Sequence, residues 1–224
     1  MSTRKLNQVN AKLTQGQRTD ISDQRMFDAT VSLVVQHGTA GTSLKEVGLL
    51  AGYSRGLASH RFGSKDSLFS FTLRKLGVLW LKQLKMATGS KVGIAAFEQA
   101  LEQHYQFCVD APDYVRTFYT LWFESVNGEG ELCAAIKKIH QRRQVDVEQW
   151  ITDDPNISAN VKQRASTIAS QFGASVIGII YFWLSNQDDL GEIKKLHEGL
   201  QETMVELLQP HTSAIELGIK KSVN

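Results

Sequence analysis

The run from Thr42 to Phe69, TSLKEVGLLAGYSRGLASHRFGSKDSLF, is the feature that most constrains how this chain can fold. Ser43 followed three residues later by Glu46 is the pattern of a capping box, which predicts the start of a helix. Gly52 stands where a helix would end in a residue that tolerates positive φ, and Ser54 can cap the next helix. The run therefore predicts two short helices around a tight turn, at about 43–51 and 54–61, followed by a third that opens at Ser64.

The rest of the chain is predicted to be helical as well. Apolar residues recur at helical spacing, and no stretch of convincing length alternates in the manner of a strand. The 224 residues include only 3 prolines, which also favours helix over turn-rich β structure. We therefore expect an all-α fold, with further helices at about 22–37, 64–86, 93–109, 113–126, 131–151, 158–186 and 190–208.

Charge divides the chain unequally. Residues 1–85 hold 13 Lys and Arg against 5 Asp and Glu, a net charge of +8, whereas residues 86–224 carry a net charge of −6. This asymmetry indicates a head that binds a polyanion and a body that does not, although chance clustering of solvated charge would look the same. The predicted organisation is a basic arm at 1–20, a head at 21–85 with its helix-turn-helix at 43–62, a body at 86–210 and a tail at 211–224.

Several other classes of protein fit the sequence poorly. The cysteines, Cys108 and Cys133, provide no disulfide framework, and the N-terminus has no apolar signal region, so we expect a cytoplasmic protein. Residues 165–187 carry no charge, but serines, glutamines and an asparagine interrupt them. Their apolar part is shorter than the roughly 20 residues that span a membrane, so a buried or interface helix is favoured and no membrane partner is expected.

The sequence also lacks the usual signs of an enzyme. It contains no HExxH, no glycine-rich loop after a strand and no Gly-x-Ser-x-Gly motif, and we expect neither catalysis nor a cofactor. His104 and Cys108 are four residues apart on a predicted helix, a spacing that suits two metal ligands, but no third ligand is evident. A helical adaptor protein is the alternative function, and it would leave the basic head unexplained.

The segment from Arg25 to about Leu76 resembles the TetR family of transcriptional regulators. The matching residues are Ala29, Gly38, Thr42 or Ser43, Val47, Ala51, Gly52, Ser54, Gly56, His60, Phe62 and the run Ser64-Lys65-Asp66-Ser67-Leu68. This resemblance implies a homodimer that binds a near-palindromic operator in double-stranded DNA. It also implies repression that is relieved when a small molecule binds the body.

In a helix-turn-helix motif the second helix presents its first residues to base edges. Arg55 is therefore the predicted base reader, because an arginine can bond both acceptors of a guanine. A plain solvated charge is the alternative for Arg55, and packing is the alternative for His60. The predicted DNA-binding residues are Thr42, Ser43, Lys45, Tyr53, Ser54, Arg55, Gly56, Ser59, His60, Arg61 and Lys65.

The body is rich in aromatic residues, which favours an apolar ligand cavity or an ordinary core. The predicted ligand-binding residues are Phe97, Leu101, Tyr105, Phe118, Tyr119, Trp122, Phe123 and Phe172. The last two helices carry apolar stripes and several small residues, which favours a four-helix dimer interface or a helix pair buried within one chain. The predicted interface residues are Ile168, Phe172, Val176, Ile180, Trp183, Leu196 and Leu200.

Overall fold

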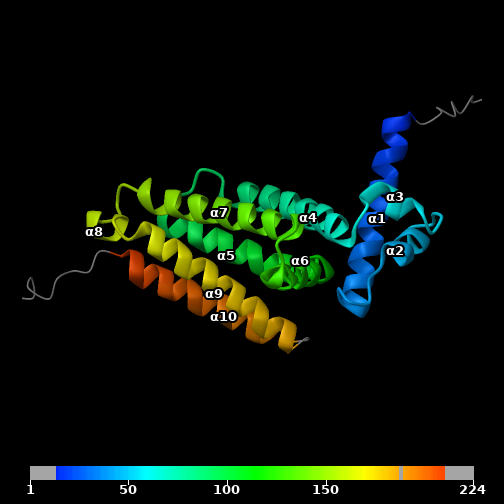
Figure 1. Ribbon diagram of the computed structural model, residues 1–224. Coiled ribbons are helices and arrows are strands. Elements are labelled where there is room, and N and C mark those ends of the chain that lie inside the picture. The colour runs from blue at the N-terminus through cyan, green and yellow to red at the C-terminus, as the bar shows by residue number, and fades with distance from the viewer. Residues whose placement is uncertain (1–13, 187–188, 210–224) are drawn as a thin grey trace, which may run out of the picture. The chain divides into compact units, whose positions relative to one another are not determined.

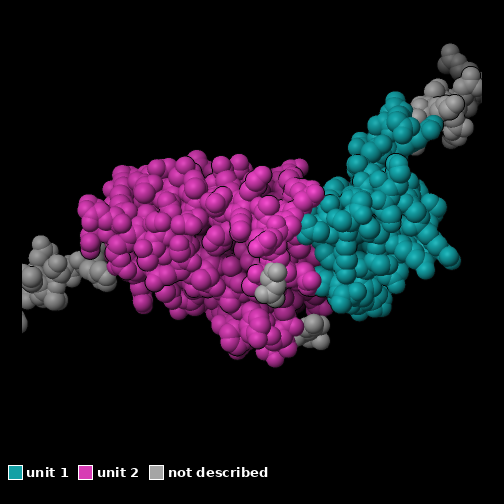
Figure 2. Space-filling model, in the orientation of Figure 1, with its two compact units in different colours: residues 1–72 teal, residues 73–224 magenta. Residues whose placement is uncertain are grey.

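A computed structural model describes residues 14–186 and 189–209, and every regular element within them is helical (Figure 1). The predicted all-α class is confirmed. The chain divides into two compact units, residues 1–72 and 73–224 (Figure 2). The helices are α1 Gln15–His37, α2 Leu44–Leu50, α3 Leu57–Phe62, α4 Lys65–Thr88, α5 Gly93–Asp110, α6 Pro112–Glu124, a 3₁₀ turn η1 Ser125–Asn127, α7 Glu131–Thr152, α8 Ala159–Lys162, α9 Ala165–Ser185 and α10 Leu190–Leu208.

In the first unit α1 packs against α2, and α2 packs against α3. Met26 and Phe27 of α1, Val47 of α2 and Ala58 of α3 are fully buried and form a small core. Burial of these apolar side chains is the main term that holds the short helices in place, because helices of six or seven residues are not stable alone.

The predicted start of α1 was wrong. The helix begins at Gln15 rather than near Ser22, because Thr14 and Gln17 form a capping box in which each side chain bonds the other residue's backbone N–H. Residues 14–20 are thus helical and do not belong to a basic arm. Arg4, Lys5 and Lys12 of that predicted arm, and the whole predicted tail at 211–224, lie outside the described residues.

The second unit is built from antiparallel helices. α5 packs against α10, α7 packs against α9, and α9 and α10 lie side by side (Figure 1). Pro112 opens α6 directly after α5, at the helix position where a missing N–H does no harm. The single helix predicted at 158–186 is divided into α8 and α9 by a turn at Gln163–Arg164, where the Arg164 N–H bonds the Val161 carbonyl.

α9 is long and apolar enough to cross a membrane by length and composition, with a mean hydropathy of 1.5 over its best window. One face of α9 is instead packed inside the unit, with Ile168 and Ile180 fully buried. The other face carries Ser175, Ser185 and further exposed polar side chains. This division of faces is that of a core helix, as the sequence predicted.

Candidate functional site

The helix-turn-helix of the first unit is set by its caps. Ser43 accepts a hydrogen bond from the Glu46 N–H, and the Glu46 carboxylate accepts from the Ser43 N–H, so the predicted capping box is confirmed. Hydrogen bonding to Ser43 also lowers the pKa of Glu46. Gly52 and Gly63 adopt φ of 80° and 74°, a region that favours glycine, and they lie at the ends of α2 and α3.

The turn between the two helices is longer than predicted. The Ser54 carbonyl accepts from the Leu57 N–H, so residues 54–57 form a turn, and α3 begins only after it, with Gly56 at the N-cap position. The prediction that Ser54 caps the second helix was therefore wrong. Arg55 lies within this turn and is exposed. Arg55 immediately precedes the N-cap residue of α3.

α2 approaches the turn very closely at Gly48. A Cβ atom at this position would lie 2.9 Å from the Ser54 backbone oxygen, which no ordinary side chain permits. The Tyr53 N–H bonds the Gly48 carbonyl and closes the same contact. Glycine at position 48 thus fixes the distance between α2 and the segment that carries Arg55.

Much of the predicted DNA surface is accessible. Tyr53 lies 5.9 Å from the Arg25 guanidinium, measured to its ring centroid, and the Lys65 ammonium lies 5.4 Å from the Phe69 ring. Both Tyr53 and Lys65 are half-buried, as is the capping residue Ser43. The exposed members are Lys45, Ser54, Arg55, Gly56, Ser59, His60 and Arg61.

Two predicted DNA contacts need correction. Thr42 is only 1% exposed, and its hydroxyl donates to the Gly38 carbonyl 2.8 Å away, so the side chain closes the α1–α2 corner. Arg61 donates from Nε and Nη2 to the two carboxylate oxygens of Asp23, at 2.9 and 2.7 Å. This ion pair, which raises the pKa of Arg61, ties α3 to α1. Thr42 is therefore unavailable to DNA, whereas the Arg61 guanidinium is 45% exposed but already paired with Asp23.

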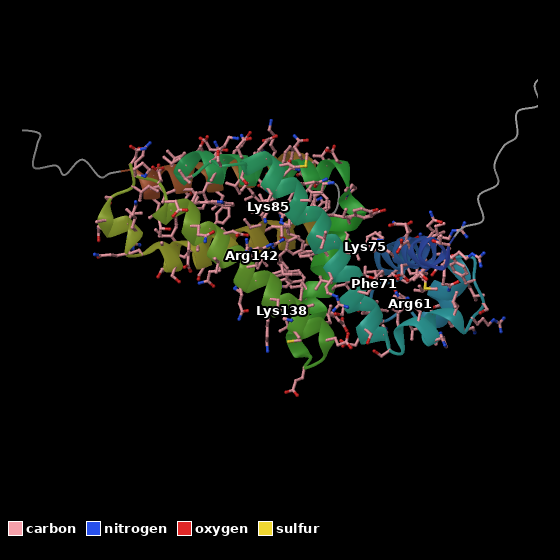
Figure 3. All side chains as sticks on the ribbon, turned by 90° about the horizontal axis from the view of Figure 1, so that it is seen from above. Arg61, Phe71, Lys75, Lys85, Lys138 and Arg142 are labelled. Carbon is pink, nitrogen blue, oxygen red and sulfur yellow. The ribbon has the colours of Figure 1, made fainter. Side chains whose placement is uncertain are left out.

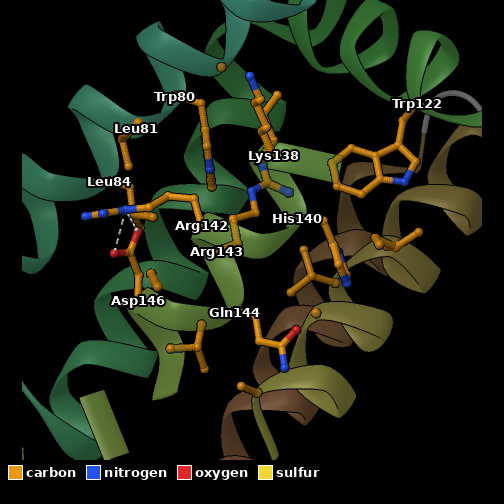
Figure 4. A pocket seen from close by; sticks show the side chains of 18 of the residues that line it. Trp80, Leu81, Leu84, Trp122, Lys138, His140, Arg142, Arg143, Gln144 and Asp146 are labelled. Carbon is orange, nitrogen blue, oxygen red and sulfur yellow. Dashed lines mark hydrogen bonds and ion pairs between the residues drawn. The ribbon is translucent and has the colours of Figure 1, made fainter. Parts of the chain in front are cut away.

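The second unit contains a cavity of about 620 Å³. Its walls come from α4, α5, α6, α7 and α9 and are mostly apolar, including Trp150 and Val176. Trp80 and Leu84 of α4 are labelled in Figure 4. Close packing of α4 on α7 closes one wall, since a Cβ at Gly77 would lie 3.3 Å from the Ile139 side chain. A cavity of this size holds a drug-sized molecule.

One wall of the cavity carries an unusual cation. The Arg143 guanidinium of α7 lies 5.7 Å from the Trp80 ring centroid, 5.2 Å from Phe118 and 5.5 Å from Trp122. Trp80 and Trp122 flank Arg143 in Figure 4. Three aromatic rings around one guanidinium form a cation–π cage, and we use the term aromatic cage for Trp80, Phe118 and Trp122.

A chain of buried hydrogen bonds adjoins this cage. His104 Nδ1 lies 2.7 Å from His197 Nε2, His104 Nε2 lies 3.2 Å from the Tyr119 hydroxyl, and His197 Nδ1 lies 2.7 Å from the Ile193 carbonyl oxygen. Because a carbonyl only accepts, His197 must donate from Nδ1. The neutral tautomer then accepts at Nε2 from His104 Nδ1–H, and Tyr119 donates to His104 Nε2.

Burial is the main reason that the histidines stay neutral. It lowers the pKa of His104 well below its ordinary value, and the neighbouring charges of His197 and Arg143 act in the same direction. Burial likewise lowers the pKa of His197 and raises the pKa of the Tyr119 hydroxyl. This series of hydrogen bonds between uncharged side chains links α5, α6 and α10, and each of its donors is matched to an acceptor.

The predicted His104–Cys108 pair does not act as one site. His104 uses both ring nitrogens on His197 and Tyr119, and burial raises the pKa of Cys108 to about 12, which keeps the thiol protonated. Within residues 14–186 and 189–209, no group of three or more His, Cys, Asp or Glu side chains is arranged to hold a metal ion.

Known proteins match the first unit most clearly. Residues 27–70 match the model of the bacterial regulatory proteins of the tetR family. This match assigns the helix-turn-helix head to the TetR family of transcriptional regulators.

Relatives by sequence agree with this assignment. The TetR-family match extends to the HTH-type transcriptional regulator BetI of Paraburkholderia phymatum, 28% identical over 110 residues, which are 48% of this chain and 56% of that protein. BetI of Paraburkholderia xenovorans is 38% identical over 72 residues, 32% of this chain and 35% of that protein. The chain therefore matches only about half or less of the length of these relatives.

Solved structures show the same fold across most of the chain. A transcriptional regulator from Rhodococcus sp. Rha1 has a TM-score of 0.72 at 20% identity, covering 84% of this chain and 96% of its own. A transcriptional regulator from Saccharomonospora viridis, solved in complex with choline, has a TM-score of 0.70 at 13% identity and covers 83% and 96%. The body as well as the head thus shares its fold with these structures.

The cavity of this TetR-family body uses only part of the predicted ligand set. Leu101, Trp122 and Phe172 line it. The remaining predicted residues do not line it, because their rings pack elsewhere: Phe97 against Trp150 and Phe172, Tyr105 against His197, Phe118 and Tyr119 against each other, and Phe123 against Tyr181.

The lining residues that the sequence analysis missed include Trp80 and Arg143. A signal for Arg143 exists in the sequence: Ile136, Ile139, Val147 and Trp150 recur at helical spacing, and Arg143 stands on the same stripe. A lone charge on an apolar stripe marks a cation that faces inward.

The predicted dimer interface also needs correction. Ile168, Phe172, Val176, Ile180, Trp183 and Leu200 are buried within the chain, because this stripe of α9 and α10 packs on the unit's own helices. Only Leu196 of the predicted set is half-exposed. The opposite face of α9 is the one that reaches solvent, and it carries Thr167, Gln171, Ala174, Ser175, Gly178, Tyr181 and Phe182.

Proposed function

We propose that this TetR-family regulator is a ligand-responsive repressor, which binds a near-palindromic operator as a homodimer and leaves it when a small molecule enters the cavity. The observation that carries the proposal is the continuity of α4. This helix begins at Lys65, directly after α3, and its later turns supply Trp80, Leu81 and Leu84 to the cavity lining. A ligand that displaces those turns acts on the same rigid element that follows the DNA-contacting helix.

The energetic requirement is simple. A ligand releases DNA only if it binds the arrangement that does not fit the operator more tightly than the arrangement that does. The choline-bound S. viridis structure supports the idea that bodies of this fold accept a small molecule. The cavity of about 620 Å³ provides the space for one here.

The proposed dimer uses the exposed face of α9 in place of the buried one. Ala174, Ser175 and Gly178 are small, and space remains open beside Gly178, so the backbone of a partner helix can approach closely. Tyr181 and Phe182 are 60% and 57% exposed at the end of the same face. Burial of two such aromatic rings favours association.

Oligomeric state tests this surface. Gly178→Glu places a charge and a long side chain in the proposed contact and should convert the dimer to monomer in sedimentation velocity. Gln163→Glu, on the exposed turn before α9, is the control and should leave the dimer intact. A Gly178→Glu protein that remains fully dimeric would assign dimerisation to another surface.

Selection of bound sequences from random duplex DNA tests the function. The purified protein should enrich a near-palindromic consensus whose half-sites lie about 34–36 Å apart, one turn of the double helix. Arg55→Ala should weaken binding by about 1–3 kcal/mol and relax the preference at one base pair of each half-site. Absence of any enriched sequence would overturn the regulator assignment and favour a helical adaptor.

A further inference from the structure

The cavity lining carries more cationic than anionic side chains. Its lining includes two carboxylates, Glu131 and Asp146, and Asp146 is already bound by Arg142, whose Nε lies 3.0 Å from its Oδ1. The close-up in Figure 4 draws this pair with dashed lines. The cationic lining residues are Arg74, Lys138, Arg142 and Arg143.

Two of these cations have no counter-ion within residues 14–186 and 189–209. Neither Arg143 nor Lys138 forms an ion pair there. Both stand on α7, the helix that also holds Arg142. Figure 3 labels Lys138 and Arg142 on this helix. The neighbouring His104 adds no charge of its own, because burial holds its pKa well below the ordinary value. An excess of positive charge thus faces a mostly apolar space.

The aromatic cage sets which charge the cavity can accept. Aromatic faces attract cations, and clusters of them are the usual means of binding a quaternary ammonium. Here the protein's own Arg143 guanidinium occupies that position, within 5.2–5.7 Å of all three ring centroids. A cationic ligand would have to displace Arg143 and would then meet Lys138 as a like charge.

The same arrangement favours an anionic ligand. A guanidinium has five N–H donors. Arg143 uses one of them in a hydrogen bond to the Tyr119 hydroxyl, which leaves others for a carboxylate. The rings hold the side chain of Arg143 in place before a ligand arrives, so little conformational entropy is lost on binding. Lys138 supplies a second, mobile donor.

We propose that the cavity takes an amphipathic organic anion, with an apolar body against Trp150 and Val176 and a carboxylate bound by Arg143. The inference rests on the proposed effector function and names the chemical class of the effector. The volume of about 620 Å³ suits a molecule of ordinary metabolite or drug size. Quaternary ammonium compounds are excluded as effectors by the same arrangement.

Matched probes of three charges test the ligand class on the full-length protein. One series has an eight-carbon chain: octanoate, octan-1-ol and octyltrimethylammonium. A second carries a ring: 4-phenylbutyrate, 4-phenylbutan-1-ol and 4-phenylbutyltrimethylammonium. Trp80, Trp122 and Trp150 line the cavity, so tryptophan fluorescence reports binding, and calorimetry gives the dissociation constants.

The carboxylate should bind more tightly than its alcohol by about 10-fold or more in at least one series, the effect expected of a hydrogen-bonded charge. Increasing salt should weaken only the carboxylate. Equal or tighter binding of the alcohol or the ammonium compound would overturn the inference, and so would a lack of carboxylate binding in both series. The DNA selection needs no ligand, so these failures are separate from a failure of the regulator assignment.

Variants locate the anion on Arg143. Arg143→Gln should lose about 10-fold in carboxylate affinity with the alcohol unchanged. Lys137→Gln removes the same charge from the exposed side of α7, outside the cavity lining, and is the matched control. Arg143→Ala empties the aromatic cage and should raise the affinity for the ammonium probes. If Arg143→Gln retains wild-type carboxylate affinity, the assignment to Arg143 is wrong; if that variant fails to fold, the wild-type charge series still decides the ligand class.

Discussion

The two units treat their cationic side chains in opposite ways. In the head, Lys45 and Arg55 stand exposed on short elements, where a polyanion as large as a duplex can reach them. In the body, Arg143 lies among three aromatic rings on the wall of a cavity, where only a small molecule fits. The surroundings of a cationic side chain thus set the size of the partner that can reach it.

The two units also have separate cores, and Phe27→Ala should separate their unfolding transitions most clearly. Phe27 is fully buried in the head, so its truncation should cost about 3–5 kcal/mol there. All 4 tryptophans lie in residues 73–224, so their fluorescence reports on the body alone, whereas circular dichroism reports on both units. Urea titration should show an early loss of helicity with the tryptophan transition unmoved.

Ile180→Ala is the complementary variant. Ile180 is fully buried in the body, and its truncation should shift the tryptophan transition by about 2–5 kcal/mol. If each variant shifted both signals together, the two units would unfold as one cooperative unit rather than separately.

Acid should act on the body more than on the head. An unfolded chain has histidines of pKa near 6.5 and binds protons below that pH, whereas the lowered pKa values of His104 and His197 prevent the folded body from doing so. Stability is therefore complete above pH 6.5 and falls below it, by about 1.4 kcal/mol per histidine for each pH unit.

Urea titrations followed by tryptophan fluorescence at pH 7.5 and 5.5 measure this effect. His197→Gln should reduce the loss on acidification, whereas His60→Gln, at an exposed position of the head, should not. A wild-type body with the same stability at both pH values would show that the buried pair accepts a proton.

Gly48→Ala tests the close approach that fixes the head. The new Cβ would lie 2.9 Å from the Ser54 backbone oxygen, so α2 or the turn must move, at a cost of about 1–3 kcal/mol. Gly56→Ala is the matched control, because its φ of −90° suits any residue and nothing lies within 4 Å of the added atom. Thermal unfolding followed by circular dichroism should show a loss for the first variant alone.

Asp23→Asn should have the smallest effect on stability. The ion pair with Arg61 is partly exposed, at 17% and 45% of the two side chains, and pairs of this kind contribute about 0.2–1 kcal/mol. The measurement is the head transition in circular dichroism. A loss as large as that of Phe27→Ala would mean that the ion pair, rather than the apolar core, holds α3 in place.

Local chemistry made the head predictable from sequence. The Ser43–Glu46 capping box and the positive φ of Gly52 depend on neighbours within a few residues, and both are present as predicted. The start of α3 was misplaced because Ser54 bonds through its carbonyl rather than its hydroxyl. Even so, the predicted and observed starts of α3 differ by less than one helical turn.

Packing between distant segments made the body harder to predict. Whether an aromatic residue lines the cavity depends on which face of its helix meets α4, α7 and α9, and Trp122 and Phe118 lie one turn apart with different outcomes. The predicted dimer interface was placed on the inner face of α9 because apolar periodicity marks the buried face of a helix. The periodicity does not show whether that face is buried by the same chain or by a partner chain. Both errors come from long-range contacts that a single sequence does not encode locally.

The ion pair between Asp23 and Arg61 also sets how the head responds to ionic strength. Each phosphate that a protein neutralises releases a condensed counterion, and the slope of log affinity against log salt counts those phosphates at about 0.9 apiece. An arginine already neutralised by its own chain releases none. A dimer that keeps both copies of this pair would therefore have a salt dependence shallower by about 1.8 than its exposed basic residues suggest. On the proposed function, Asp23 would therefore make the affinity for an operator less dependent on salt concentration.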